Sequence, residues 1–359
     1  MWRSNWLKRS ERLGFRVRLP IGPLIGVLLA LTPLVGERPV VSGQGATARS
    51  GASAPLRTPW GHPNLQGVWT NATDTPLERP VEFGERAQLT ANELQERKAR
   101  AATNLANEPS VARGDPGTYN AFWRDPIRPT GRTSLIIDPP NGRLPPLTPD
   151  AEKRRTARAT ELASHPFWRA DGPEDRPYFE RCIGRGWPRV GGTYQFTYQI
   201  FQNQQYVVLL AEMVNERLFI PLDGRPHGPI RQWMGDPRGR WEGDTLVVET
   251  INYPDLPNSL LVGVDTLNYP YGQLGGSAKN LRLVERFRRI DAETLDYQFT
   301  VHDPTTFTRP WTASVPMRPA EGLFEYACHE GNYGIRNVLS GHRADEAAAG
   351  TAAPKPPAR

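Results

Sequence analysis

The carboxyl-terminal half of the sequence consists of short strand-like runs with no helical pattern between them, and this constrains the fold more than any other feature. From about residue 190 onward such runs recur every ten to fifteen residues, separated by turn sequences rich in glycine, aspartate and proline. Closely spaced strands without helical crossovers indicate an antiparallel sheet, because parallel strands need long connections. The expected strands are residues 193–202, 205–213, 217–222, 230–234, 240–250, 280–290, 294–302, 309–317 and 323–328.

Alternation within one of these runs is typical of a half-buried strand. Leu295, Tyr297, Phe299 and Val301 share one face, while the residues between them are polar. We therefore predict a mainly β fold, in which residues 190–344 form an antiparallel β-barrel or a strongly bent sheet.

The preceding proline-rich segment, residues 60–189, contains two helix signatures. Thr90 and Glu93 have the spacing of a capping box, which predicts a helix that runs to about residue 105. Thr148 followed by Pro149 marks the start of a second helix, which is expected to end near residue 164. We expect both helices to pack on the barrel.

Three other segments carry local signals. Residues 134–137 and 143–144 flank a turn sequence that contains Pro-Pro-Asn-Gly, and we expect them to pair as a hairpin. Residues 44–59 are small, polar and proline-bearing, which predicts a flexible leader. Residues 345–359 are rich in alanine and proline and are expected to be a disordered tail.

The amino-terminal region, residues 1–43, has the organisation of a secretory signal peptide. Residues 1–20 contain six basic side chains and one acidic side chain, an apolar run follows over 21–35, and small residues precede Gly43. We expect cleavage after Gly43 and a periplasmic or extracellular location, with membrane contact only during export. A retained membrane anchor is the alternative, but the apolar run is short for a bilayer span and contains two prolines.

The net charge of +6 comes almost entirely from this leader. Residues 1–43 hold seven of the 44 basic and two of the 38 acidic residues, which leaves 37 basic and 36 acidic residues in the remainder. A nearly neutral chain has no basic stripe for a phosphate backbone, so we expect no nucleic-acid partner.

The two cysteines, Cys182 and Cys328, most simply form one disulfide in an exported protein. A metal site at Cys328 and His329 is the alternative, although it lacks a second pair of residues at ligand spacing. The motifs of serine hydrolases, zinc peptidases, kinases and dinucleotide-binding enzymes are absent from the sequence. We therefore expect neither a metal nor a cofactor.

The chain resembles two groups of known proteins, and the second resemblance covers nearly all of the chain after the signal peptide. Gly67-Val68-Trp69 resembles the G-x-W motif of calycins, the lipocalin-like group, in which the tryptophan closes one end of a barrel. That resemblance implies a calycin-like barrel. Longer strings are similar to a family of exported bacterial proteins of unknown function, and this similarity implies no activity and no catalytic residue. These strings are residues 221–227, 231–236, 239–246 and 325–333.

The expected last strand carries a candidate acid–base pair. Alternation places Glu325 and His329 on one face, roughly 7 Å apart along a strand. With Glu330 beside it, His329 could act as a general acid or base near neutral pH. The alternative is structural, in which His329 caps the strand and Glu325 pairs with an arginine.

A glycine-flanked loop between two expected strands carries Arg225 and His227, and Arg231 follows closely. Loops at the mouth of a barrel often hold ligand contacts, and these three side chains could bind an anion. The alternative is a plain turn with solvated charges.

Residues on expected strands add a possible ligand cavity. Glu285 falls on the apolar face of residues 281–287, where it is either paired with an arginine or placed for a task. Trp233, Trp241 and Trp311 lie on or beside strands and could line such a cavity, although core packing explains them equally well.

Three functions are compatible with these features. The first, which the sequence favours, is binding of a small, partly apolar ligand in a cavity lined by tryptophan and tyrosine, with arginine, histidine and glutamate at its polar end. The second is a cofactor-free hydrolase, lyase or isomerase in which His329, a glutamate and a donor such as Arg231 or Tyr333 converge. The third is an interaction protein of the cell envelope with an exposed aromatic patch.

Overall fold

The structure is a computed structural model in which all described residues belong to one compact unit. The chain divides into residues 1–51 and residues 52–359. The first unit contains the whole predicted signal peptide and residues 44–51 of the predicted leader, and it lies outside the described residues. The last part of the predicted tail, residues 353–359, also lies outside them. The described residues are 56–106, 125–127, 129–164, 170–176, 179–190, 192, 196–254, 263–264 and 280–352.

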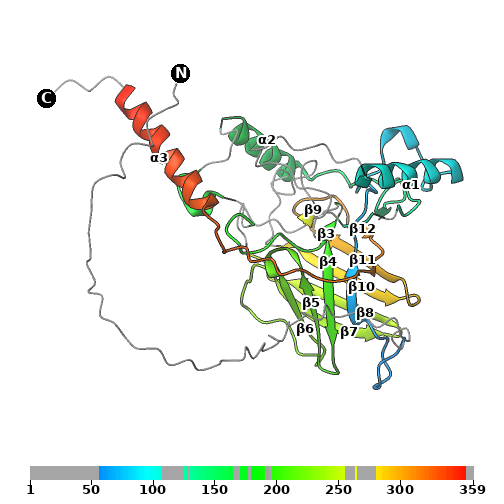
Figure 1. The fold of residues 1–359 in the computed structure, drawn as a ribbon. Coiled ribbons are helices and arrows are strands. Elements are labelled where there is room, and N and C mark those ends of the chain that lie inside the picture. Colours follow the sequence, from blue (N-terminus) through cyan, green and yellow to red (C-terminus); the bar gives the residue numbers. More distant parts are fainter. Residues whose placement is uncertain are drawn as a thin grey trace, which may run out of the picture. The chain divides into compact units, whose positions relative to one another are not determined.

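Two antiparallel sheets form the body of the fold (Figure 1). The five-stranded sheet has the order β13-β1-β4-β5-β6, with β1 at Gly67–Thr70, β4 at Thr197–Gln202, β5 at Tyr206–Ala211, β6 at Arg217–Pro221 and β13 at Arg318–Pro319. The six-stranded sheet has the order β2-β12-β11-β10-β8-β7, with β2 at Ile136–Asp138, β7 at Asp236–Glu242, β8 at Thr245–Ile251, β10 at Arg282–Arg289, β11 at Leu295–His302 and β12 at Trp311–Ser314. A short parallel pair joins β3 at Arg189–Val190 to β9 at Gly263–Val264.

The two sheets share one hydrophobic core. In β11 the apolar residues that alternate in the sequence are buried, whereas those between them are partly exposed. Burying one large apolar side chain stabilises a fold by about 1.5–3 kcal/mol, so this common core is the main source of stability. The five-stranded sheet contributes Trp69, Tyr198, Ile200, Val207, Leu209, Leu218 and Ile220 to it.

The prediction of a mainly β, antiparallel chain is confirmed. Among the described strands, β13 and β6 end one sheet and β2 and β7 end the other, so their backbone pairings form no closed barrel. The observed arrangement is two separate sheets around one core.

Several expected strand boundaries differ from the structure. Residues 240–250 divide between β7 and β8, because Gly243, with a φ of +58°, permits a tight turn between the two strands. Residues 230–234 form no strand. The expected hairpin with residues 143–144 is wrong, because β2 pairs with β12 instead.

Three α-helices are described. The capping box predicted for the first is confirmed, because the Thr90 N–H donates to Glu93 Oε2 at 2.7 Å and the Glu93 N–H donates to Thr90 Oγ1 at 3.3 Å. None of the described helices is both long and apolar enough to cross a membrane. The helices are α1 at Ala91–Ala106, α2 at Pro149–Ser164 and α3 at Gly334–Ala352, with short 3₁₀ helices at Val81–Phe83, Pro173–Asp175 and Met213–Asn215.

The third helix, α3, continues into the segment that was expected to be disordered. Residues 345–352 belong to this helix, and their alanines have the highest helix propensity of any residue.

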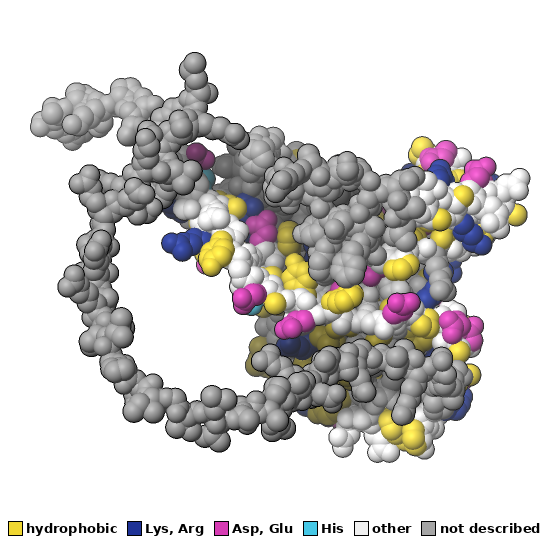
Figure 2. Space-filling model, viewed as in Figure 1, with side chains coloured by type: hydrophobic (Ala, Val, Ile, Leu, Met, Phe, Trp, Pro, Cys, Tyr) yellow, Lys and Arg dark blue, Asp and Glu magenta, His cyan; other side chains and the backbone are white. Residues whose placement is uncertain are grey.

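On the face of the molecule in Figure 2, acidic, basic and apolar side chains of the described residues are interspersed.

The predicted disulfide between Cys182 and Cys328 is confirmed. It joins the segment before β3 to the segment between β13 and α3. Beside it, Asn332 Nδ2 donates to the Glu180 carbonyl at 3.4 Å and lies 3.3 Å from Cys182 Sγ. The disulfide therefore anchors the segment that leads into α3.

Replacing both cysteines by serine should lower the free energy of unfolding, because the disulfide joins residues separated by 146 positions in the sequence. In the chain-entropy model, closing a loop of this length stabilises the folded state by up to about 5 kcal/mol. Urea unfolding followed by circular dichroism measures the change. An unchanged unfolding midpoint would contradict a stabilising role for the bond.

Candidate functional site

A fully buried carboxyl group lies in the core between the two sheets. Glu285, on β10, has an exposed fraction of 0% and shares its face of the strand with Leu283 and Phe287. Its Oε1 accepts hydrogen bonds from Trp187 Nε1 at 2.6 Å and from the Tyr297 hydroxyl at 2.7 Å. Its Oε2 has no hydrogen-bond partner among the described residues. One oxygen is therefore held in place, while the other can still accept a hydrogen bond.

Burial changes the acidity of this group. It raises the pKa of Glu285 from the ordinary 4.5 to about 7, although the hydrogen bonds from Tyr297 and Trp187 favour the charged form. A buried polar atom without a hydrogen bond costs free energy, and native proteins contain few of them. The carboxyl group can therefore gain or lose a proton near neutral pH, and its second oxygen suits a donor that the described residues do not supply.

Aromatic rings surround the carboxyl group. The Tyr297 ring stacks on Phe287 with centroids 4.6 Å apart, and Trp187 meets Tyr198 edge-on at 5.5 Å. Tyr253 is also buried, and burial together with the nearby carboxylate charge raises the pKa of its hydroxyl. These rings create an apolar environment that contains indole and hydroxyl groups.

Further buried carboxyl groups lie near a buried guanidinium. Arg189, at the start of β3, is 1% exposed and lies over the Phe196 ring, 4.5 Å from its centroid. Burial raises the pKa of Glu216 to about 7 despite the positive charge of Arg189, and burial with the charge of Asp125 raises the pKa of Glu212 to about 7. Burial also raises the pKa of Asp125, which accepts a hydrogen bond from the Phe196 N–H at 2.5 Å. Several interior carboxyl groups can thus take up protons near neutral pH.

One short segment reaches both groups of acids. The Gly186 N–H donates to Glu216 Oε1 at 3.1 Å, and the next residue, Trp187, donates to Glu285. Asn71 Nδ2 donates to the carbonyl two residues after Trp187 at 2.9 Å, which fixes the backbone of this segment. The positions of the two acidic groups are therefore connected through consecutive residues.

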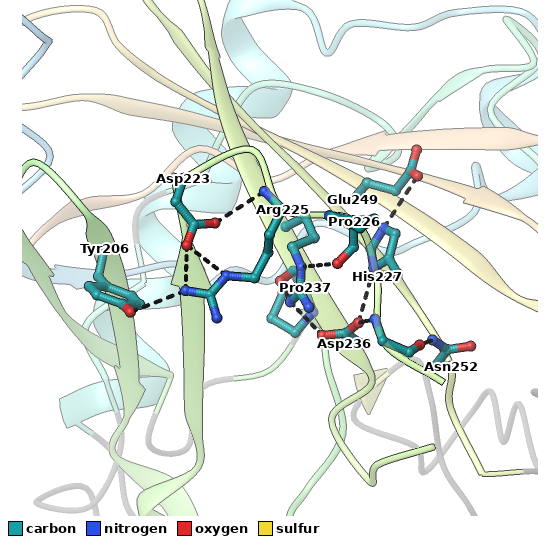
Figure 3. Close-up of polar contacts among 11 residues, drawn as sticks. Tyr206, Asp223, Arg225, Pro226, His227, Asp236, Pro237, Glu249 and Asn252 are labelled. Atoms are coloured by element: carbon teal, nitrogen blue, oxygen red, sulfur yellow. Dashed lines mark hydrogen bonds and ion pairs between the residues drawn. The ribbon is translucent and has the colours of Figure 1, made fainter. Parts of the chain in front are cut away.

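A second polar cluster lies on the outer face of the six-stranded sheet, where β7 begins (Figure 3). His227 Nδ1 lies 3.3 Å from Asp236 Oδ2, and His227 Nε2 lies 3.5 Å from Glu249 Oε1. The Gly228 N–H donates to Asp236 Oδ2 at 2.7 Å, and Asn252 Nδ2 donates to the Gly228 carbonyl at 2.6 Å. The imidazole therefore lies between two carboxylates, although its Nδ1 has no hydrogen-bond partner among the described residues.

Arginines complete this outer cluster. Arg282 Nε donates to Glu249 Oε2 at 2.7 Å, and Arg238 Nη1 donates to Asp236 Oδ1 at 2.5 Å. Partial burial raises the pKa of Glu249, but the hydrogen bond and charge of Arg282 outweigh it and hold that pKa below its ordinary value. Because both carboxylates have a cationic partner, we interpret the cluster as a clamp that fixes the loop at residues 223–235 to the sheet.

The three residues expected to bind an anion contact different groups. Arg225 Nε donates to Asp223 Oδ2 at 2.6 Å, and its Nη2 lies 3.4 Å from the Tyr206 hydroxyl, on the side away from His227 (Figure 3). Arg231 Nη1 donates at 2.7 Å to a backbone carbonyl just after β8. Each of the three side chains thus has its own protein partner.

The expected acid–base pair near the carboxyl terminus lies on the surface. Residues 323–327 have no regular structure and residues 328–331 form a turn, so the expected last strand is wrong. In place of a strand ladder, the Tyr326 carbonyl accepts a hydrogen bond from the Asn215 side chain at 2.8 Å. Strand alternation therefore does not place Glu325 and His329 on one face. All of the candidates in this segment are exposed, namely Glu325, His329, Glu330 and Tyr333.

The three candidate tryptophans differ in their surroundings. Trp311, on β12, is buried and meets Phe299 edge-on at 5.6 Å. Trp241 stacks on His62 with centroids 4.7 Å apart, and Trp233 lies 5.5 Å from an arginine guanidinium. Trp311 therefore belongs to the same core as the buried carboxyl group. Trp241 is partly buried and packs against that core, and Trp233 is partly buried.

The sequence identified Glu285 but not its partners. Tyr297 lies on the buried face of β11. A prediction that β10 pairs with β11 would therefore have placed Tyr297 near Glu285. Trp187, Glu212 and Glu216 lie outside the strands, where no periodic pattern marks a residue as buried.

Comparisons with family models, curated proteins and solved structures find no match for this chain. The function must therefore be inferred from the geometry of the buried carboxyl group and its surroundings.

Glu285→Gln should change how the free energy of unfolding depends on pH. The folded-state pKa of about 7 lies above the ordinary 4.5, so the unfolded carboxyl group ionises first as the pH rises. The stability contributed by this group is complete below about pH 4.5 and is lost as the pH rises toward 7, by about 3 kcal/mol in total. Because glutamine does not ionise, the variant should lose less stability over this range than the wild type.

Urea unfolding at about pH 4.5 and about pH 8 measures this difference. Glu325→Gln is the matched control, because Glu325 is exposed and its removal should leave the wild-type pH dependence intact. Equal pH dependence for Glu285→Gln and the wild type would show that the pKa of Glu285 is not raised in the folded chain.

Proposed function

We propose that this chain binds a small, partly apolar ligand in the interior between its two sheets, with Glu285 as the polar anchor. The observation that carries the proposal is a carboxyl group with 0% exposure, one oxygen held by Trp187 and Tyr297 and the other without a partner among the described residues. Perturbed, incompletely paired buried groups gather at functional sites. A ligand hydroxyl or amine would supply the missing donor.

The aromatic surroundings of Glu285 suit the apolar part of such a ligand. The rings of Trp187, Tyr253 and Tyr297 are buried in this region, and aromatic surfaces contribute strongly to the binding of apolar groups. This supports the expected combination of tryptophan, tyrosine and glutamate. His227 and His329 lie in other places, so we propose Glu285 as the anchor without them.

Acid–base catalysis is the second candidate function, and one observation favours it. A carboxyl group whose pKa is about 7 is suited to give and take protons near neutral pH. In that case the reacting group would lie against Oε2, and the role that the sequence suggested for His329 would belong to Glu285.

Export to the periplasm or beyond is part of the same proposal. The disulfide between Cys182 and Cys328 fits an oxidising compartment. The signal-peptide pattern and the resemblance to exported bacterial proteins also support export. The resemblance to calycins agrees with a β fold that binds its ligand in the interior.

A thermal-shift screen against alcohols and amines that carry an apolar group tests this function. We expect some of these compounds to raise the melting temperature of the wild type and of His329→Ala, but not of Glu285→Gln, which has lost the carboxylate acceptor. Stabilisation of Glu285→Gln equal to that of the wild type would contradict Glu285 as the anchor. A library without any stabilising compound would count against ligand binding itself.

A further inference from the structure

Away from this interior, α3 carries side chains with the composition of a metal site. His342 and Glu346 lie one turn apart on the same side of the helix, as residues at positions i and i+4 do. Asp171 approaches them from the segment that precedes Pro173–Asp175. His342 Nε2 lies 3.0 Å from Asp171 Oδ1 and 3.5 Å from Glu346 Oε1.

Two of the separations among these three atoms are close to those of ligands around one ion. Bonds of about 2.0–2.2 Å to a tetrahedral zinc ion place neighbouring ligand atoms roughly 3.3–3.6 Å apart. The separations of 3.0 and 3.5 Å from His342 Nε2 are close to this distance, and all three atoms lie within 4.8 Å of one another. An ion could therefore replace the imidazole–carboxylate contacts if the exposed Asp171 and Glu346 side chains move closer to each other around it.

Arg343 orients the two acidic residues. Its Nη1 donates to Glu346 Oε2 at 2.5 Å, which leaves Glu346 Oε1 directed toward His342, and its Nη2 donates to the Asp171 backbone carbonyl. Hydrogen bonds of this kind orient the ligands of natural metal sites. Because the guanidinium charge opposes a cation, affinity has to come from coordination bonds and not from net negative charge.

The donor atoms select the class of ion. One imidazole nitrogen and two carboxylate oxygens are donors of zinc sites that keep a fourth position for water, whereas Ca²⁺ and Mg²⁺ prefer oxygen ligands alone. The side chains of Asp171, His342 and Glu346 are 46%, 28% and 47% exposed, so an ion can reach them from solvent.

We propose that Asp171, His342 and Glu346 bind one Zn²⁺ ion, which fastens α3 to the segment that contains residue 171. The disulfide between Cys182 and Cys328 already joins neighbouring parts of the same two regions. The ion is thus a second cross-link that holds the carboxyl-terminal helix, and this inference is independent of the ligand proposed for the interior.

Calorimetric titration of the exported, untagged protein with ZnCl₂, after removal of bound metal with a chelator, tests the site. We expect one equivalent of zinc to bind to the wild type. His342→Ala and Asp171→Asn should each weaken binding by about tenfold or more, because each removes a ligand. His329→Ala removes another exposed histidine near α3 and should bind zinc as the wild type does.

Thermal unfolding gives a second measurement of the same site. Zinc should raise the melting temperature of the wild type and of His329→Ala but not of His342→Ala, because an ion that binds the folded chain stabilises it. Circular dichroism of the metal-free variants checks that α3 is intact, and Asp171→Asn tests the site without any change in the helix. Equal zinc affinity of the wild type and the two site variants, no binding by the wild type, or loss of binding in His329→Ala would each overturn the proposal.

Discussion

The hydrogen bonds that Trp187 and Tyr297 donate to Glu285 are the interaction on which much of the structure depends. They join β10, β11 and the irregular segment before β3 within the core that both sheets share. A carboxyl group at this depth would strongly destabilise the fold without such partners. The same segment follows Cys182 and continues into Arg189, so its position also determines where the disulfide and the buried guanidinium lie.

The two polar clusters of the six-stranded sheet differ in how completely their carboxyl groups are paired. On the outer face, Asp236 and Glu249 each have an arginine partner and hold His227 between them, which is the arrangement of a structural clamp. On the inner face, Glu285 keeps one oxygen without a partner among the described residues and has a pKa of about 7. Carboxylates that already have arginine partners have little left to offer a ligand, whereas a buried carboxyl oxygen without a partner does. This contrast is the reason to place the function in the interior.

Local patterns in the sequence predicted much of the fold but only one member of the candidate site. The alternation of β11 and the capping box of α1 are properties of neighbouring residues, and both predictions are confirmed. The expected strand at 323–328 has the composition of a strand but pairs with none, because strand formation depends on a distant partner. Trp187 lies in an irregular segment, and its hydrogen bond to Glu285 joins residues that are 98 positions apart in the sequence. Contacts of that separation are set by the packing of the whole core, which no local pattern encodes.

The Glu285 carboxyl group is buried, is fixed by two hydrogen bonds, and has a pKa of about 7 in place of the ordinary 4.5. Carbon-13 NMR of side-chain carboxyl groups, titrated in the wild type and in Glu285→Gln to assign the resonance, measures its pKa directly. We expect the wild type to show a resonance that titrates with a pKa of about 7 and that is absent from Glu285→Gln. A Glu285 resonance that titrates near the ordinary value of 4.5 would contradict it, because such a carboxyl group would be solvated and could not anchor a ligand in the core.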